Sequence, residues 1–399
     1  QGVSSAASDV YKRQQLPIPE YQKGKAILSG TIANYHPNDN LIFKIGAPNI
    51  VMGTAETLYP TVESDGSFTI NIPLYHHTQV RMMIGNADLV ILLSPEKETN
   101  VAINLSNPPG KQFVFSGQYA TINNEWCQPE LITKIPPVYS DGDLLDSIVG
   151  ISANEFKKRC INQYKRYVTH NNAQLQFSED TRTLANLSCA FDCLENLQAT
   201  HYCLQTAYQK KENITREQAF AAFLDVYLPD DFHNYLKDFP VNHPLALYCY
   251  NYRNVVMDLY DTHKDPLAYE KNLLKNAPLT KEEQTLIHQY ETAFKAGISF
   301  QQESELMALS AKYFKENDLF RWESFSKAKE RLSNIIQDST SLIVDYIRAI
   351  YMRSSFYNLQ PLTPRQELMA SEITNPIFLG IIQDMNRQMQ PCLLYTSDA

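Results

Sequence analysis

The sequence predicts an α+β multidomain protein with a small antiparallel β-sandwich followed by an irregular all-α helical bundle. Short segments with apolar residues at every second position fill residues 24–118, and turn signals separate them. From residue 119 to 391, apolar residues recur three and four apart and helix-start signals are frequent. We therefore expect a linker at 16–23, a β-sandwich at 24–118 and a helical domain at 119–391.

The composition excludes several classes of protein. The 399 residues include 35 Lys and Arg against 44 Asp and Glu, and the net charge of −9 disfavours nonspecific binding to nucleic acid. Hydrophobic residues make up 44%, which suits ordinary cores and is too high for a disordered chain. The longest strongly apolar run, at 89–93, is too short for a transmembrane segment. Seven cysteines are too sparse for a disulfide scaffold.

The two ends of the chain differ from the rest. VSSAASDVYKRQ near the start and CLLYTSDA at the end resemble translated sequencing-adapter sequence. A natural flexible tail at each end is the alternative. We expect residues 1–15 and 392–399 to be such artefacts and leave them out of the fold prediction.

The sandwich is expected to contain about seven strands. Asp65-Gly66 tolerates positive φ and predicts a hairpin, after which residues 68, 70, 72 and 74 place apolar side chains on one face. The continuous apolar run at 89–93 is typical of a strand that is covered on both faces. The strands are expected at 26–32, 41–45, 68–74, 80–84, 89–93, 101–105 and 113–115.

Helix starts are readable in the second part. Ser152 with Glu155, Thr215 with Gln218, and Thr280 with Glu283 fit the capping box, and prolines follow Thr363 and Asn375 at first helical positions. The longest helix is expected from Ser178 to about Lys210. Further helices are expected at 216–227, 243–261, 280–295, 301–315, 318–336, 339–358 and from 376 onward.

Three cysteines share the predicted long helix. Cys189, Cys193 and Cys203 form a stripe opposite the leucines, but the first and last are roughly 21 Å apart along the axis, too far for one metal ion. We expect them to pack as small buried hydrophobes against a neighbouring helix. The chain contains no Cys-x-x-Cys, the usual spacing of a redox pair.

Other candidate residues also favour structural roles. His76 and His77 are neighbours in a predicted strand and point to opposite faces, so they cannot share a metal without a bend. Asp225, Asp230, Asp231 and His233 form an acidic patch that a hydrolase could use, although a helix cap and a solvated turn explain it more simply. Residues 338–341 are read as a helix start. We expect no catalytic, cofactor-binding or metal-binding residue, and no cofactor.

The order of several short motifs is similar to a known family. LPIPE at 16–20 is followed by GKAILSG at 24–30, NYHP at 34–37, DGSF at 65–68, LLSPEKET at 92–99, FSG at 115–117 and ATINNE at 120–125. This order resembles the region that precedes the thioredoxin domain in TlpA-like thiol–disulfide oxidoreductases of Gram-negative envelopes. The resemblance covers nearly all of residues 16–391.

The resemblance implies a truncated, accessory part of such an enzyme, located in the periplasm or cell envelope. The family's redox domain carries Trp-Cys-x-x-Cys, which has no counterpart here, so no catalytic residue is transferred. The accessory part would position the redox domain, recognise client proteins or pair with a second copy of itself. A secreted binding or scaffold protein without enzymatic activity is the alternative, and a hydrolase that uses Asp230 is a third, weaker hypothesis.

Overall fold

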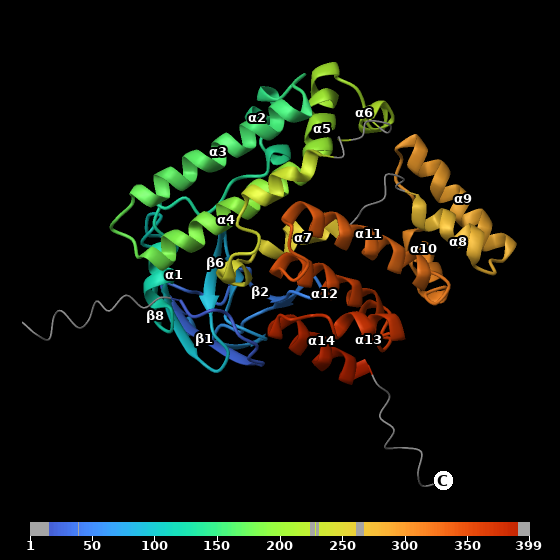
Figure 1. Ribbon diagram of the computed structural model, residues 1–399. Helices are drawn as coiled ribbons and strands as arrows, with labels where there is room; N and C mark the ends of the chain where they lie inside the picture. The colour runs from blue at the N-terminus through green and yellow to red at the C-terminus, as the bar shows by residue number, and fades with distance from the viewer. Residues whose placement is uncertain (1–15, 39, 224–227, 229–230, 261–266, 390–399) are drawn as a thin grey trace, which may run out of the picture.

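The structure is a computed structural model, and its division into strands followed by helices confirms the predicted fold class (Figure 1). It describes residues 16–38, 40–223, 228, 231–260 and 267–389. All the strands and helices named below lie within these residues.

The first part is a sandwich of two four-stranded sheets. Sheet A has the strand order β4-β1-β7-β8, and sheet B has the order β3-β2-β5-β6. The seven predicted strands are all present, and β3, which has no apolar alternation, was missed. The strands are β1 Gly24–Ile32, β2 Phe43–Asn49, β3 Thr54–Leu58, β4 Ser67–Leu74, β5 Thr78–Ile84, β6 Ala87–Leu93, β7 Glu98–Ile103 and β8 Phe113–Gly117.

The sequence predicts an antiparallel sandwich, but one pair of strands is parallel. β1 and β7 pair in parallel, from Ile27 opposite Glu98 to Ile32 opposite Ile103. Parallel neighbours need a long crossover connection. Here the chain provides one, because the five strands β2 to β6 lie between β1 and β7 in the sequence.

The second part is helical, and its predicted boundaries are mostly confirmed. Thr215, Thr280 and Thr363 form reciprocal capping boxes, whereas Ser152 accepts only the hydrogen bond from the Glu155 backbone. The helices are α1 Ala120–Trp126, α2 Gly142–Ser147, α3 Ala153–Ala173, α4 Glu179–Gln198, α5 Thr200–Glu212, α6 Arg216–Phe223, α7 Tyr252–Tyr260, α8 Ala268–Asn276, α9 Lys281–Ala296, α10 Glu303–Lys312, α11 Asp318–Ile336, α12 Leu342–Tyr357, α13 Pro364–Ala370 and α14 Pro376–Met389. Short 3₁₀ helices lie at η1 Val138–Ser140, η2 Phe232–Asp238 and η3 Pro244–Tyr248.

Two long helices were predicted as continuous, and this was wrong. The helix expected from Ser178 to about Lys210 is two helices, because the backbone leaves the helical region at Ala199 (ψ 9°) and restarts as α5. The Thr200 hydroxyl donates to the Leu197 carbonyl at this break, and α5 then packs against α2 and η1. The helix expected at 243–261 is likewise divided into η3 and α7.

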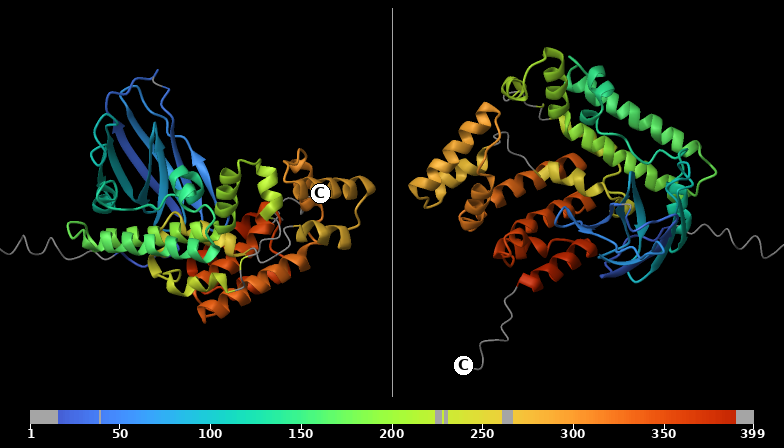
Figure 2. Two further views of the ribbon diagram at one scale, coloured as in Figure 1. Left: turned by 90° about the horizontal axis from the view of Figure 1, so that it is seen from above. Right: turned by 180° about the vertical axis from the view of Figure 1, so that it is seen from behind.

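Sheet B lies between two hydrophobic cores. Ile91 and Leu93 of β6 point into the sandwich core, whereas Leu92 of the same strand belongs to the helical core. Tyr346 of α12 adds a hydrogen bond of 2.8 Å to the Ile50 carbonyl, which follows β2. The sandwich therefore stands on one side of the layer of helices (Figure 2), and the run at 89–93 is covered on both faces only toward its end.

The segment at 16–23 is packed against the helices and does not behave as an exposed linker. Leu16 is buried in the helical core, and Tyr248 donates a hydrogen bond to the Pro17 carbonyl. Tyr21 lies over Gly380 of α14, where a Cβ would be only 2.4 Å from its ring. Lys23 forms an ion pair of 2.9 Å with Asp384 on the same helix.

A satellite group of helices has its own small core. Leu273, Ile287, Leu309 and Tyr313 of the α8–α10 region pack together, separately from the main helical core. These helices project at the far end of the molecule from the sandwich (Figure 1). The helical part is thus irregular, as predicted.

Candidate functional site

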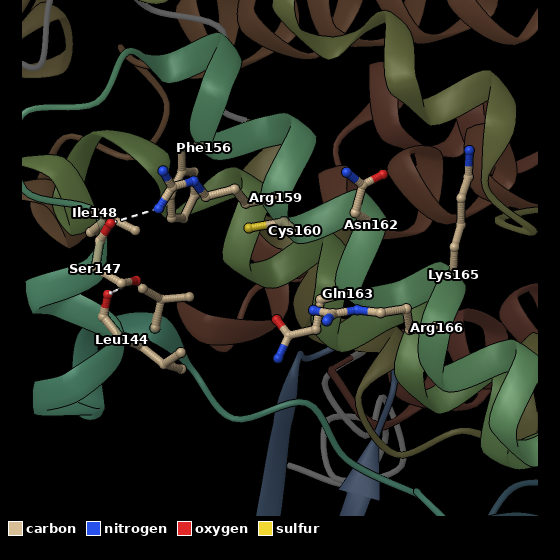
Figure 3. A pocket seen from close by; sticks show the side chains of 11 residues that line it. Leu144, Ser147, Ile148, Phe156, Arg159, Cys160, Asn162, Gln163, Lys165 and Arg166 are labelled. Atoms are coloured by element: carbon tan, nitrogen blue, oxygen red, sulfur yellow. Dashed lines mark hydrogen bonds between the residues drawn. The ribbon is translucent and has the colours of Figure 1, made fainter.

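Two cavities stand out in the described part of the chain. The first, of about 710 Å³, lies between α2 and α3 and is shown in Figure 3. Its wall includes Cys160, but burial raises the pKa of that thiol to about 12. Arg159 already donates to the Ser147 carbonyl at 2.6 Å, and Lys165 points away from the other side chains (Figure 3). This cavity therefore combines few groups that could act together.

The second cavity, of about 740 Å³, lies where the sandwich meets the helices and is the candidate functional site. Its walls combine apolar and polar side chains from both parts of the chain, as ligand sites at domain junctions usually do. Strand β6 contributes residues 87–90, and the start of β8 with its preceding loop contributes Pro109, Gly110, Gln112 and Phe113. The helical side contributes Trp126, residues 133–135, Asp192 and Asn251 among others.

Asp192 is a carboxyl group in this cavity whose pKa is raised. Burial raises its pKa from 3.8 to about 6, although hydrogen bonds from the Ile135 backbone (2.8 Å) and the Asn251 amide (2.6 Å) favour the charged form. Since the pKa is raised overall, the effect of desolvation is larger than that of the two hydrogen bonds. The charge of Lys134 also lowers the pKa, and it is the smallest of these effects.

Asn251 lines the same cavity with one unsatisfied atom. Its amide nitrogen donates to the Ser188 carbonyl and hydroxyl and to Asp192, which fixes the orientation of the side chain. Its Oδ1 is buried and has no hydrogen-bond partner among the described residues. Buried polar atoms are rarely left unpaired, so this acceptor is one that a ligand could satisfy.

Three consecutive residues of α1 precede Trp126, which lines the cavity, and they hold the surrounding elements together. The Asn123 amide both accepts from the Leu92 N–H (2.7 Å) and donates to its carbonyl (3.0 Å), at the edge of β6. Asn124 repeats this two-way pairing with Phe115 of β8. The next residue, Glu125, accepts hydrogen bonds from the backbone and hydroxyl of Ser178, at the start of α4. α1 therefore ties both sheets to the central helix.

Polar side chains also hold the extended segment at 131–138, which forms a wall of the site. Asn171 pairs with both backbone groups of Ile132, and Asp192 accepts from Ile135. Asn196 accepts from Val138 and donates to the Pro136 carbonyl. The segment is thus fixed by the side chains of α3 and α4 and not by a neighbouring strand.

The environment of the cysteines favours a structural role. Cys189 and Cys193 lie on α4 and Cys203 on α5, so the prediction of one shared helix was wrong, but all three are buried as expected. Burial raises the pKa of Cys189 and Cys203 to about 12, and of Cys193 still further. All six cysteines in the described ranges are free thiols.

The histidine pair lies in a bend between β4 and β5 and not within a strand, so the geometric premise about opposite faces was wrong. His76 is buried and bonds to the His77 backbone, while the His77 ring bonds to the Tyr119 hydroxyl. Burial lowers the pKa of His76 to about 4. Within the ranges that the structure describes, no three His, Cys, Asp or Glu side chains are grouped to hold a metal.

The acidic patch is only partly described. Asp225 and Asp230 lie outside the described residues. Asp231 is exposed at the start of η2, and His233 is partly buried beside Tyr235. Burial lowers the pKa of His233 to about 4, with the charges of Arg331 and Lys157 adding to the effect. Residues 338–341 precede α12, as predicted.

The residues in and around this site carry no sequence pattern that marks them as a site. Asn123 and Asn124 were placed at the start of the helical pattern and in a family-like motif, and Asp192 and Asn251 were not singled out. Their partners lie between 9 and 63 residues away along the chain, so no local pattern connects them.

Comparison with known proteins does not add to this picture. No family model, no curated protein and no solved structure matches the chain. Among the helices of the described ranges, none has the length and apolar character that a membrane crossing requires.

The pKa of Asp192 predicts a specific dependence of stability on pH. Because the folded-state pKa is raised, its contribution to stability is complete below about pH 4 and is lost as the pH rises through about 6. A difference of about 2 between folded and unfolded pKa corresponds to at most about 3 kcal/mol. Urea unfolding of wild type and Asp192→Asn at pH 4.5 and 7.5 should show the wild type losing stability relative to the variant at the higher pH. If the difference in unfolding free energy between wild type and Asp192→Asn were equal at both pH values, the raised pKa of Asp192 would be contradicted.

Proposed function

We propose that this chain is the non-redox, polypeptide-binding part of a TlpA-like thiol–disulfide oxidoreductase of the periplasm or cell envelope. The observation that carries the proposal is the cavity between sandwich and helices, which has mixed apolar and polar walls and a buried, unpaired acceptor on Asn251. Concave sites with mostly apolar walls and a few placed polar groups are the usual form of a binding site. The partner would be a client protein of the redox enzyme.

The state of the thiols supports a binding role. A reactive cysteine needs a lowered pKa, because the thiolate is the nucleophile. Burial instead raises the pKa of Cys127 to about 11 and that of Cys160, Cys189 and Cys203 to about 12, and it also raises that of Cys249. At pH 7, a thiol with a pKa of 11 is ionised in only about one molecule in ten thousand.

We expect that the purified full chain does not increase the rate at which dithiothreitol reduces insulin disulfides. The same protein should bind fluorescein-labelled, reduced and carboxymethylated α-lactalbumin, a permanently unfolded polypeptide, with saturable anisotropy. Native α-lactalbumin is the matched control and should not bind. Catalysed insulin reduction, or no binding of the unfolded probe, would refute the proposal.

A secreted binding or scaffold protein without an enzymatic partner is the second candidate, since the cavity is built from this chain alone. Sequencing outward on the source DNA separates the two. A Trp-Cys-x-x-Cys within the next domain length, about 100 residues, supports the oxidoreductase. A stop codon just after residue 391 supports the scaffold protein.

A further inference from the structure

We propose that the free edge of β6 is the docking site inside this cavity, and that it takes an extended polypeptide segment as an added strand of sheet B. The inference rests on the proposed function and specifies how the partner is held. Main-chain hydrogen bonds would give the affinity, and the two walls of the cavity would select the side chains.

The pairing register shows which backbone groups of β6 face outward. β5 and β6 are joined by the two-residue turn Gly85-Asn86, and Ile84 opposite Ala87 closes the hairpin. In such a hairpin the closing pair exchanges hydrogen bonds, and hydrogen-bonded pairs then recur at every second residue. Residues 87, 89, 91 and 93 therefore face β5, and residues 88, 90 and 92 face away from it.

One of the three outward-facing residues already has a partner. The Leu92 N–H and carbonyl are both bonded to the Asn123 amide, which confirms the direction deduced from the hairpin. The amide occupies the place that one peptide unit of an adjacent strand would take. It ends the free edge at this point, and Asp88 and Val90 remain open beyond it.

Asp88 and Val90 each offer one backbone donor and one acceptor to a neighbouring strand. Their backbone groups have no hydrogen-bond partner among the residues that the structure describes. Val90 is half-buried and Asp88 is exposed, and both line the cavity. Proteins usually protect such an edge, and here it opens into a cavity with walls on both sides.

The two walls suit the alternating side chains of an extended segment. On the side of the sandwich, the cavity is lined by Leu89, Phe113 and Pro109, which are mainly apolar. On the side of the helices, it is lined by Asp192 and Asn251, with the Arg81–Asp88 ion pair of 2.6 Å at the sheet surface. A segment with apolar and polar residues in alternation would match one wall with each set. Small molecules lack the repeated donor and acceptor that this edge presents.

The test uses proline to remove one outward donor without disturbing the sheet. Val90→Pro deletes an N–H that faces the cavity and leaves the β5 pairing intact, a position where edge strands tolerate proline. Val90→Ala keeps the N–H and controls for the lost side chain. Thr57→Pro is the matched control on the other edge of sheet B, because Gly46 faces β5 and its partner Thr57 therefore faces away from β2.

We expect Val90→Pro to weaken binding of labelled, carboxymethylated α-lactalbumin at least tenfold, while Val90→Ala and Thr57→Pro bind within about threefold of wild type. Circular dichroism and the thermal midpoint establish that each variant is folded. Hydrogen exchange on the wild-type protein provides a second measurement, in which the probe should slow exchange of the Asp88 and Val90 amides. This measurement holds even if Val90→Pro does not fold.

The outcomes separate the inference from the proposed function. Binding that is unchanged in Val90→Pro, with no protection of the two amides, would overturn the β6 site but leave the binding function in place. Absence of any binding by wild type would overturn both. Protection of the two amides that rises with protein concentration in the absence of probe would assign the edge to a second copy of the chain, and would overturn the client as its occupant.

Discussion

Replacing Asp345 by alanine is expected to lower the free energy of unfolding by about 3–5 kcal/mol, the range for removing one partner of a buried ion pair. Asp345 of α12 is 1% exposed. One of its oxygens accepts from Arg348 at 2.7 Å, and the other accepts from the Thr374 backbone and hydroxyl and from the Asn375 backbone. It therefore joins α12 to the turn that begins α14.

The loss is large because the variant leaves several buried groups unpaired. Arg348 would keep only a longer contact of 3.5 Å to the more exposed Glu372, and its Nε already has no partner among the described residues. The matched control is Asp338→Ala, which removes an exposed carboxylate that accepts from the Thr340 backbone and hydroxyl just before the same helix. Urea unfolding should show a far smaller change for Asp338→Ala, and similar changes in the two variants would contradict the argument.

Gly30→Ala should destabilise the sandwich by about 3 kcal/mol, the upper part of the range for overpacked cores. Gly30 lies in β1 between two paired strands, and a Cβ there would lie 2.1 Å from the Val101 carbonyl oxygen and 3.0 Å from the Phe68 ring. The first neighbour is backbone and cannot rotate away. The parallel pairing of β1 with β7 would have to open.

Gly46→Ala is the control for this prediction. It is also a strand glycine of the sandwich, but its Cβ would meet nothing closer than 3.5 Å, an ordinary contact. We expect a change of less than about 1 kcal/mol there. Thermal unfolding of the two variants side by side is the measurement, and comparable midpoints would show that the close approach at Gly30 is relieved by a small shift.

The sequence predicted the strands and helix starts well, because both depend on neighbours within a few residues. The alternation at 68–74 and the capping box at Thr280 are local signals, and both are present in the structure. The errors arise where a tertiary contact determines where a helix begins or ends. The break at Ala199 depends on one backbone angle that allows α5 to reach α2, and residue periodicity does not register it.

The candidate site could not be predicted for the same physical reason. Asn123 was visible in a motif, but its role depends on Leu92, which is 31 residues away. Asp192 had no distinguishing pattern, since its raised pKa comes from burial between α4 and the segment that contains Ile135. Such properties arise from the packing of distant segments.

The contact between Lys23 and Asp384 has a consequence for synthesis of the protein. The two residues are 361 positions apart, so at about 5–20 residues per second the ribosome needs roughly 20–70 s to make the second after the first. During that interval the sandwich can form, but α14 is not yet present for Tyr21 and Lys23 to pack against. The early segment is therefore accessible to proteases and chaperones until the last helix emerges.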